Sequence, residues 1–489
     1  MTNIVNKDDI KVMTREEEIQ KEKDLFFEGF LKRYYFDLLK EGRGENRTIE
    51  LYITSKCTGN CSYCYLIRHG EELYPYDLLD EDKLINNLKI FIDWYKENKF
   101  SCEINLFTGE IITTGFFFKL MEVFYEGFKE KYYPYKPWSI SLAEAGDFLN
   151  SDYLTEKVQN WIDKFKEIDI DLHFSLSIDG KVLDEKNRGR KHLDEFYQKA
   201  MNFAEKNFLA FHPMVSAYNI EDWIANYDWW HSSEVPKQIG DRIMMLEVRD
   251  NNWTNDKITE YLKFLNYVFD KELERTKEDK ITFAKRIFGI DSYPSKGYDN
   301  ISLNFLFTDD EQNDQSGMGC SVQRNLCIRL GDFAVAPCHR TSYKDFIGGY
   351  FKVENGKIVG YHGENVEIMC AINSWNRTTS PKCARCDVAC FCPSGCFGSN
   401  YESTHDLFTT PETVCNLMKA RIYFILMKVE EMGLMPYLPQ ILSPSQYDTV
   451  LKLRQKIISG FERYGDAFGD AAFDAHKLGK GTDNVTLST

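Results

Sequence analysis

The sequence contains no apolar run long enough to span a membrane, and its first residues lack the basic start and apolar core of a signal peptide. We therefore expect a cytoplasmic protein with no membrane partner, in a compartment where disulfides are disfavoured. Basic residues are also in deficit, since 60 Lys and Arg stand against 76 Asp and Glu and give a net charge of −16. This charge argues against nucleic acid as a partner, because phosphates need a basic surface.

The composition is that of a folded enzyme-sized chain. Hydrophobic residues make up 43% of the 489 residues and aromatic residues 15%, which excludes a disordered chain. The length suggests about three domains. Neither a phosphate-binding glycine loop nor a nucleophile elbow is present. Fourteen cysteines remain to be explained, and in a reducing compartment they indicate metal binding.

Strand-like and helical patterns alternate over residues 47–295. We predict strands at 48–54, 102–108, 137–143, 170–178, 210–216 and 242–248. We predict helices at 81–98, 114–130, 153–166, 190–206, 219–230 and 257–274. Six consecutive β–α units imply a parallel sheet with right-handed crossovers, and they are too few for a closed eight-stranded barrel. The predicted fold class is therefore α/β, with a partial (β/α)6 barrel of the TIM type.

Three further segments flank this barrel. Residues 1–46 form a helical segment in which Leu25, Phe26, Phe30, Tyr34 and Leu38 predict one apolar face. This face either packs on the domain that follows or docks the leader sequence of a peptide substrate. Residues 300–430 hold ten of the cysteines and little helical periodicity, so we predict a loop-rich domain folded by metal. Residues 431–489 are predicted to be C-terminal helices and a disordered tail.

The most informative motif is the triplet Cys57, Cys61 and Cys64, which directly follows the apolar run 49–53. It lies where a strand ends, the place where α/β barrels keep their chemistry. Three thiolates are one short of a closed zinc or iron–sulfur site, which leaves an exchangeable position on the metal. The alternative is a set of buried structural cysteines.

This spacing, with the aromatic Tyr63 before the third cysteine, resembles that of the radical S-adenosylmethionine (SAM) enzymes. The resemblance implies that the triplet holds a [4Fe–4S] cluster whose fourth iron binds the amino and carboxylate groups of the SAM methionine. It also assigns a SAM contact to Tyr63 and matches the barrel predicted above.

Two strand ends carry further motifs that resemble the SAM site of this family. Gly109 and Glu110 match the last two residues of its Gly-Gly-Glu motif, which binds the SAM amino group, whereas Thr108 replaces the first glycine. Ser177 and Asp179 match a Ser-Ile-Asp-Gly stretch near the SAM ribose and methionine.

Two other positions near the predicted SAM site are less clear from the sequence. Arg188 follows where relatives place an arginine on the SAM carboxylate, but the neighbouring Arg190 and Lys191 are equally compatible with a solvated basic run. After the third strand, relatives carry Thr-Asn-Gly, and of Ala143-Glu144-Ala145-Gly146 only the glycine matches.

The cysteine-dense segment resembles the SPASM extension of radical SAM enzymes. By that resemblance two auxiliary [4Fe–4S] clusters are expected, which makes three clusters in all. The first would be bound by Cys320, Cys327, Cys338 and Cys396, and the second by Cys383, Cys386, Cys392 and Cys415. Cys102, Cys370 and Cys390 are left over. Zinc is the physical alternative, because four-cysteine zinc modules use similar spacings.

Acidic residues at the end of the sixth predicted strand are candidate catalytic groups. Glu247 and Asp250 should face the barrel cavity, where a carboxylate could remove a proton from a substrate radical. A salt-bridged strand end explains them equally well.

The resemblance as a whole implies a radical SAM/SPASM oxidoreductase. Reduced flavodoxin or ferredoxin would donate an electron, and cleavage of SAM would give a 5′-deoxyadenosyl radical that abstracts hydrogen from substrate. We expect a peptide substrate with a leader sequence and a thioether or carbon–carbon crosslink as the product. The alternative within the family is oxidation of Cys or Ser to formylglycine in a sulfatase. The alternative of another class is a non-enzymatic electron carrier or zinc scaffold.

Overall fold

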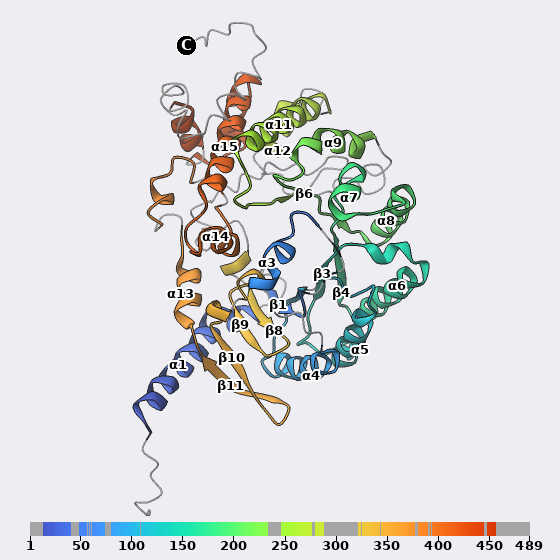
Figure 1. The fold of residues 1–489 in the computed structure, drawn as a ribbon, viewed down its shortest axis with the longest axis vertical. Helices are drawn as coiled ribbons and strands as arrows, with labels where there is room; N and C mark the ends of the chain where they lie inside the picture. Colours follow the sequence, from blue (N-terminus) through green and yellow to red (C-terminus); the bar gives the residue numbers. More distant parts are fainter. Residues whose placement is uncertain are drawn as a thin grey trace, which may run out of the picture.

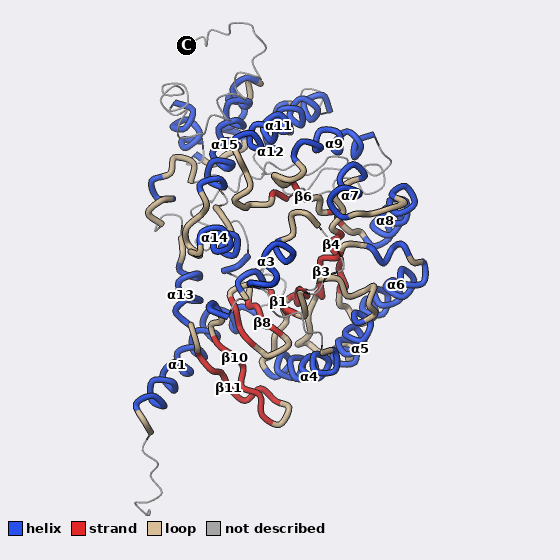
Figure 2. Tube along the Cα trace, viewed as in Figure 1, coloured by secondary structure: helices blue, strands red, loops and turns tan. Residues whose placement is uncertain are grey.

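A computed structural model shows how the chain folds (Figure 1). It describes residues 13–40, 48–55, 57, 59, 61–73, 80–107, 109–232, 246–275, 279–287, 321–323, 325–342, 344–376, 380–389, 392, 394–444 and 447–455. Helices surround a curved central sheet, and the C-terminal third of the chain lies beside one edge of it (Figures 1 and 2). The predicted α/β class is confirmed.

The central sheet has nine strands in the order β11-β10-β9-β8-β1-β2-β3-β4-β5. Its parallel part consists of β1 Thr48–Tyr52, β2 Glu103–Phe107, β3 Ser139–Glu144, β4 Asp171–Leu176 and β5 Ala210–Phe211. A second sheet pairs β6 Met214–Val215 with β7 Leu246–Glu247, also in parallel. The parallel strands therefore follow one another in sequence order, as the partial barrel requires.

The predicted fifth strand, 210–216, is interrupted in the structure. It divides into β5 and β6 around Pro213, which has no N–H to donate to a sheet ladder. The sixth predicted strand, 242–248, is present as the short β7, and its residues 242–245 lie outside the described part of the chain.

Helices cover the outer face of the sheet (Figure 2). Those that share the apolar core of the sheet are α4 Glu81–Glu97, α5 Phe116–Phe128, α6 Asp152–Glu167 and α8 Leu193–Asn207. The other helices of this region are α3 Tyr65–Leu73, α7 Lys181–Arg188, α9 Trp223–Ser232, α11 Asn255–Arg275 and α12 Lys280–Ile287. Helix starts are set locally, for example by Asp80 and Ser151, whose side chains accept hydrogen bonds from the first turns of α4 and α6. In β2, Ile104 and Leu106 are buried against this helical layer.

The inner face of the sheet is polar. Glu103 and Asn105 alternate with the buried apolar residues of β2, and the Asn105 amide donates a hydrogen bond of 3.0 Å to the Ser141 hydroxyl on β3. Alternation of this kind places one set of side chains in the core and the other inside the partial barrel. The interior of the barrel is therefore suited to a polar substrate.

The N-terminal helical segment packs differently from the predicted face. It comprises α1 Arg15–Leu31, a π-helical turn at Lys32–Phe36 and α2 Asp37–Leu39. Leu25, Phe26 and Tyr34 are 60%, 58% and 45% exposed, so the prediction that they face the core is wrong. Phe30 of the predicted face is buried, and the other buried residues of the segment are Phe27, Leu31, Tyr35, Phe36 and Leu39. The π-helical turn is wider than an α-helical turn and shifts the buried face along the helix.

The cysteine-dense segment extends the barrel sheet. Strand β8 Leu326–Arg329 pairs in parallel with β1, and β9 Ala334–Ala336, β10 Gly349–Glu354 and β11 Lys357–Gly363 continue it as an antiparallel meander. The prediction of a loop-rich segment is thus wrong for this part, because the second edge of β1 offers the backbone partners that it pairs with. The domain boundaries at 46, 295 and 430 stay predictions.

The rest of the C-terminal region is helical. It contains α13 Val366–Ser374, α14 Phe397–Thr404 and α15 Glu412–Glu431, and α15 packs with α11 around a second apolar core. In the described part of the chain, no helix combines the length and hydrophobicity needed to cross a membrane.

Candidate active site

The Cys57, Cys61 and Cys64 loop follows β1 at the carboxyl end of the parallel strands. The backbone N–H of Gly59 donates a hydrogen bond of 3.3 Å to the Cys57 sulfur. A Cβ added at Gly59 would lie 3.4 Å from the Cys57 sulfur and 3.7 Å from the Cys61 sulfur. The loop therefore folds tightly around this glycine and holds two of the thiols close together.

Three thiols are the ligand set of a [4Fe–4S] cluster with one open iron. Among the described residues, no three His, Cys, Asp or Glu side chains are arranged to hold one metal ion. In a [4Fe–4S] cluster each cysteine binds a different iron, so the sulfurs need not converge on one atom. Burial raises the pKa of the Cys61 thiol to about 11, against the opposing effect of the Arg188 guanidinium. Bound iron would favour the thiolate.

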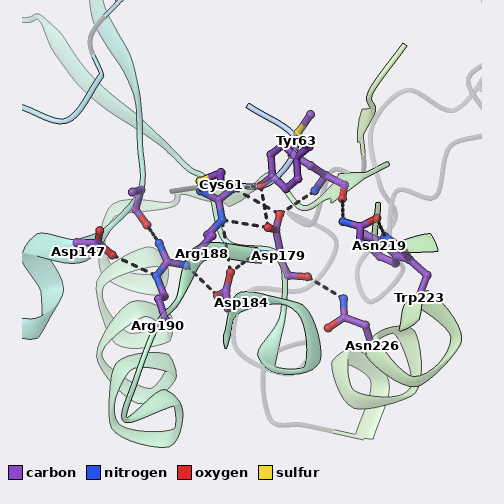
Figure 3. A network of polar contacts seen from close by, with 12 residues as sticks. Cys61, Tyr63, Asp147, Asp179, Asp184, Arg188, Arg190, Asn219, Trp223 and Asn226 are labelled. Carbon is purple, nitrogen blue, oxygen red and sulfur yellow. Dashed lines mark hydrogen bonds and ion pairs between the residues drawn. The ribbon is translucent and has the colours of Figure 1, made fainter. Parts of the chain in front are cut away.

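A buried network connects this loop to the segments after β4 (Figure 3). The Tyr63 hydroxyl donates a hydrogen bond of 2.7 Å to the Asp179 carboxylate. Arg188 donates from Nε to the same carboxylate at 3.0 Å, from Nη2 to the Tyr63 hydroxyl, and from Nη1 to the Cys61 sulfur at 3.5 Å. The guanidinium therefore places a positive charge directly beside a predicted cluster ligand.

Asp179 is fixed by its surroundings. Its carboxylate also accepts from the Met214 backbone N–H at 2.9 Å, and its carbonyl accepts from the Asn226 amide at 2.7 Å and the Trp230 indole at 3.3 Å. The chain can turn here because the next residue is Gly180, at φ +111°, where a Cβ would lie 2.3 Å from the Asn226 side chain.

The second arginine of this region is buried too. Arg190 forms an ion pair of 2.8 Å with Asp184 and one of 3.2 Å with Asp147. Asp184 in turn accepts a hydrogen bond of 3.0 Å from the Asp179 backbone N–H. The side chains of Arg188 and Arg190 are only 8% and 5% exposed. The alternative interpretation, that they belong to a solvated basic run, is therefore wrong for both.

The predicted SAM amino-group site, Gly109 and Glu110, lies in the turn that follows β2. The Gly109 N–H donates to the Thr54 carbonyl at 3.1 Å, which ties this turn to the end of β1. Glu110 is 2% exposed, and its Oε1 accepts hydrogen bonds of 3.2 Å from the backbone N–H groups of Ile112 and Thr113.

Ser177 lies beside the predicted amino-group site. Its backbone N–H donates to the Glu144 carbonyl at 2.7 Å. The buried Glu144 thus lies next to the motifs of Glu110 and Ser177. Its own segment, after the third strand, did not match the Thr-Asn-Gly motif of the relatives. Sequence reasoning missed this residue.

A further group in the barrel interior involves His339. Its ring stacks on Phe107 with 4.2 Å between centroids, and its Nδ1 lies 3.2 Å from the Glu50 carboxylate. Asn325 donates to the other Glu50 oxygen at 2.9 Å. Burial would raise the pKa of Glu50, but the charge and hydrogen bonds of His339 and the hydrogen bond from Asn325 together lower it. The alternation of β1 gave the only sequence signal for Glu50, since it places that residue opposite the apolar Ile49 and Leu51.

The two predicted catalytic carboxylates are both held in ion pairs. Glu247 lies 2.7 Å from Arg421 and accepts a hydrogen bond of 2.7 Å from the Tyr261 hydroxyl. Burial would raise the pKa of Glu247, but Arg421, Arg249 and the Tyr261 hydrogen bond together lower it. Asp250 lies 2.6 Å from Arg68 of α3. This geometry favours the salt-bridged interpretation, and the catalytic roles stay predictions.

The described auxiliary cysteines fall in two regions. Cys386 and Cys392 pack against the core around α15, and Cys415 lies in the first turn of that helix. Burial raises the pKa of Cys392 to about 11, with a further contribution from Cys386 and Cys415. Cys383 begins the short 3-10 turn Cys383–Arg385, which directly precedes Cys386.

The remaining auxiliary cysteines lie nearer the sheet. Cys338 belongs to a small core with Phe397, the neighbour of Cys396. Cys327 is fully buried on β8, and burial raises its pKa, with contributions from Glu50 and Cys338. Cys320 lies outside the described residues. The two predicted ligand sets stay predictions.

Comparison with solved structures identifies the fold as that of the radical SAM enzymes with a SPASM-type domain, which the sequence motifs predicted. The particular structures are those of anSMEcpe, an anaerobic sulfatase-maturating enzyme. Native anSMEcpe with bound AdoMet has a TM-score of 0.52 and 15% sequence identity, over 79% of this chain and 99% of that one. Its complex with AdoMet and the Kp18Cys peptide has a TM-score of 0.51 and 14% identity, over the same shares of the two chains.

A third structure, a histidine-tagged form of anSMEcpe with bound AdoMet, has a TM-score of 0.51 and 14% identity, over 83% of this chain and 98% of that one. No protein-family model and no curated protein matches the sequence. At these identities the comparison establishes the fold, and the function has to be argued from the site.

Proposed function

We propose that this chain is a radical SAM enzyme that oxidises a peptide substrate and forms a thioether or carbon–carbon crosslink in a ribosomally made peptide. The observation that carries the proposal is the position of the Cys57, Cys61 and Cys64 loop beside the buried network of Tyr63, Asp179 and Arg188. When bound, a [4Fe–4S] cluster and SAM supply the species that abstracts hydrogen, and flavodoxin or ferredoxin supplies the electron.

Different residues of the chain would bind different parts of SAM. Gly109 and Glu110 would bind the amino group, and Ser177 and Asp179, which follow β4, would lie near the SAM ribose and methionine. Arg188 carries the buried positive charge that a SAM carboxylate needs, and it is oriented toward Cys61. The chain's contribution is to orient these groups and to exclude water.

The auxiliary cysteines would complete the oxidation. After hydrogen abstraction, the substrate radical must lose one electron and one proton to give a crosslinked product. The eight predicted cysteines would hold two auxiliary [4Fe–4S] clusters, which would supply a place for this electron. Zinc in these sites could not accept an electron, because zinc has no redox chemistry.

The second candidate is oxidation of Cys or Ser to formylglycine in a sulfatase. The observation that favours it is the fold shared with anSMEcpe. One of the anSMEcpe structures is a complex with a peptide. Both candidates need a peptide partner and the same radical chemistry. The non-enzymatic alternative has less support, since an electron carrier has no use for a buried arginine network around an incomplete ligand set.

Iron content and SAM cleavage test the enzyme class. Anaerobically reconstituted protein should hold about twelve irons, which is three four-iron clusters, and should form 5′-deoxyadenosine from SAM and dithionite. C386S should lower the iron content by about four. C102S is the matched control, because Cys102 is buried directly before β2 and is not one of the predicted ligands, so this change should leave iron unchanged. Zinc without deoxyadenosine would overturn the proposal.

The mass of a co-expressed peptide separates the two candidates. A crosslink removes two hydrogens, so the precursor peptide should lose about 2 Da per bond formed. Conversion of a substrate Cys to formylglycine exchanges sulfur for oxygen and removes two hydrogens, a loss of about 18 Da. An unchanged mass across every small peptide encoded nearby would count against peptide maturation.

A further inference from the structure

The chain directly after β7 contacts the cysteine-dense segment through Arg249. The Nη1 of Arg249 donates a hydrogen bond of 3.3 Å to the Ser394 carbonyl, and the Arg249 carbonyl accepts one from the Ser399 hydroxyl of α14. The Ser394 N–H in turn donates at 3.3 Å to the sulfur of Cys392. The side chain and the backbone of Arg249 are therefore both held against the chain around Cys392, a predicted ligand of the second auxiliary cluster.

The guanidinium of Arg249 is only partly used by the protein. Its Nε is buried, and no acceptor among the described residues reaches it. Glu247, two residues earlier, is already paired with Arg421 at 2.7 Å, which leaves Arg249 without an ion pair in the described part of the chain. Native proteins rarely leave a buried N–H group without an acceptor, because its lost hydration is not replaced. The open Nε therefore indicates an acceptor that the described residues do not provide.

The Cys392 thiol lies within reach of the charge of Arg249. Burial raises the pKa of this thiol, whereas the Ser394 hydrogen bond and the Arg249 charge oppose the increase. Cys386 and Cys415 both act on the Cys392 thiol, so three of the four predicted ligands lie near one another. A [4Fe–4S] cluster on these cysteines would offer sulfur atoms that carry negative charge and accept hydrogen bonds. The open donor and the thiols around it therefore fit such a cluster.

We propose that Arg249 donates a hydrogen bond from Nε to the cluster bound at Cys392 and raises the reduction potential of that cluster. The inference rests on the proposed function and deepens it, because it gives a residue of the barrel a role at the auxiliary cluster. Reduction adds one electron to the cluster, and a neighbouring positive charge stabilises the more negative state. A hydrogen bond to a cluster sulfur acts in the same direction. Arg249 would thus act through the cluster, by making it a better acceptor for the electron that the substrate radical has to lose.

The midpoint potential of this cluster tests the proposal without relying on activity. It is measured by redox titration of the full-length, anaerobically reconstituted protein, followed by electron paramagnetic resonance, and the relevant signal is the one that C386S removes. R249Q removes both the charge and the Nε donor. At a fixed potential it should shift the ratio of reduced to oxidised cluster about tenfold toward the oxidised form, which is a fall in midpoint potential of about 59 mV for one electron. R249K keeps the charge and removes the Nε donor, so it should give a smaller fall.

Arg454 provides the matched control, because R454Q removes the same charge far from this cluster. Arg454 is paired with Glu430 at 2.7 Å, and Glu430 follows Cys415 by 15 residues on α15. At 1.5 Å per residue this separation is about 22 Å along the helix, well beyond the Debye length in physiological salt. R454Q should therefore leave the midpoint potential as it is in the wild type.

The iron content separates a change in potential from a loss of the cluster. A wild-type potential in R249Q with full iron content, or an equal fall in R454Q, overturns the role of Arg249 and leaves the enzyme class intact. If R249Q does not take up the cluster, R249K decides: a potential below that of the wild type supports the role, and a wild-type potential or loss of the cluster overturns it.

The iron content of C386S shows whether the cluster exists. If C386S removes neither iron nor a signal, this inference fails together with the proposed second auxiliary cluster. Formation of 5′-deoxyadenosine from SAM still decides the enzyme class in that case.

Discussion

The phenol of Tyr63 donates a hydrogen bond of 2.7 Å to the carboxylate of Asp179, which is completely buried. The two residues lie at the ends of different strands, and Arg188 joins them from a third segment. Burial, reinforced by Asp179, raises the pKa of Tyr63, so the phenol keeps its proton and remains a donor. The loop of Cys57, Cys61 and Cys64 is thereby anchored to Asp179, on the far side of the predicted SAM site, before any ligand binds.

Removing the charge of Asp179 should destabilise the protein and loosen this loop. D179N removes the closer carboxylate partner of the buried Arg188 and leaves it only the longer ion pair of 3.5 Å with Asp184. Breaking a buried pair costs about 3–5 kcal/mol. Urea unfolding followed by circular dichroism measures the loss. D171N is the control, because Asp171 is exposed at the start of the same strand and should cost less than about 0.5 kcal/mol. Equal midpoints for the two variants would contradict the structural role of the network.

Gly180 and Gly189 provide a matched pair of alanine substitutions. Both have positive φ values, +111° and +67°, but a Cβ on Gly180 would collide with Asn226, whereas one on Gly189 meets nothing within 4 Å. G189A should cost about 1–2 kcal/mol from backbone strain alone. G180A adds a steric clash at the turn that carries Asp179, and should cost clearly more. A smaller effect for G180A than for G189A in thermal unfolding would show that the turn relaxes freely.

His212 should make stability depend on pH. Burial, together with the charge of His173, lowers the pKa of His212 to about 4 from an unfolded value of 6.5. The unfolded state therefore binds more protons between these values, so stability is complete above pH 6.5 and falls as the pH drops toward 4. Between pH 7 and pH 5 the loss should be about 2 kcal/mol.

The control for His212 uses two asparagine variants. H212N should remove this part of the pH dependence, which thermal unfolding at pH 5 and pH 7 measures. H405N changes an exposed histidine in a conformation that asparagine also adopts, at φ +58°, and should leave the pH dependence as it is in the wild type. An unaltered pH profile in H212N would assign the dependence to another group.

The buried face of α1 can be tested at two adjacent residues. Phe27 is fully buried against the β10–β11 hairpin, and its ring meets Tyr361 edge-on at 6.5 Å, whereas Phe26 is 58% exposed. F27A should cost about 3–5 kcal/mol. F26A should change stability by less than about 0.5 kcal/mol. The opposite ranking in urea unfolding would restore the helical face predicted from the sequence.

The sequence alone determined the elements that depend on local order. The parallel strands, the helices between them and the cysteine triplet at the end of β1 are encoded by residues close together in the chain. For the same reason the motifs at Gly109 and Asp179 could be located, since each directly follows a strand whose apolar pattern is plain. The carboxyl ends of parallel strands necessarily meet at one edge of the sheet, so these motifs converge.

Contacts between distant segments were decided only by the tertiary structure. Three examples are the pairing of β8 with β1, the ion pair of Glu247 with Arg421 and the contact of Glu110 with Glu144. In each case the two segments are far apart in the sequence, and the local pattern of one does not indicate the other. The face of α1 is a similar case, because a π-helical turn and the surface offered by β11 override the helical period. Local propensity fixes which segments are helices and strands, whereas burial and charge pairing are properties of the assembled fold and select among the faces and partners that each segment offers.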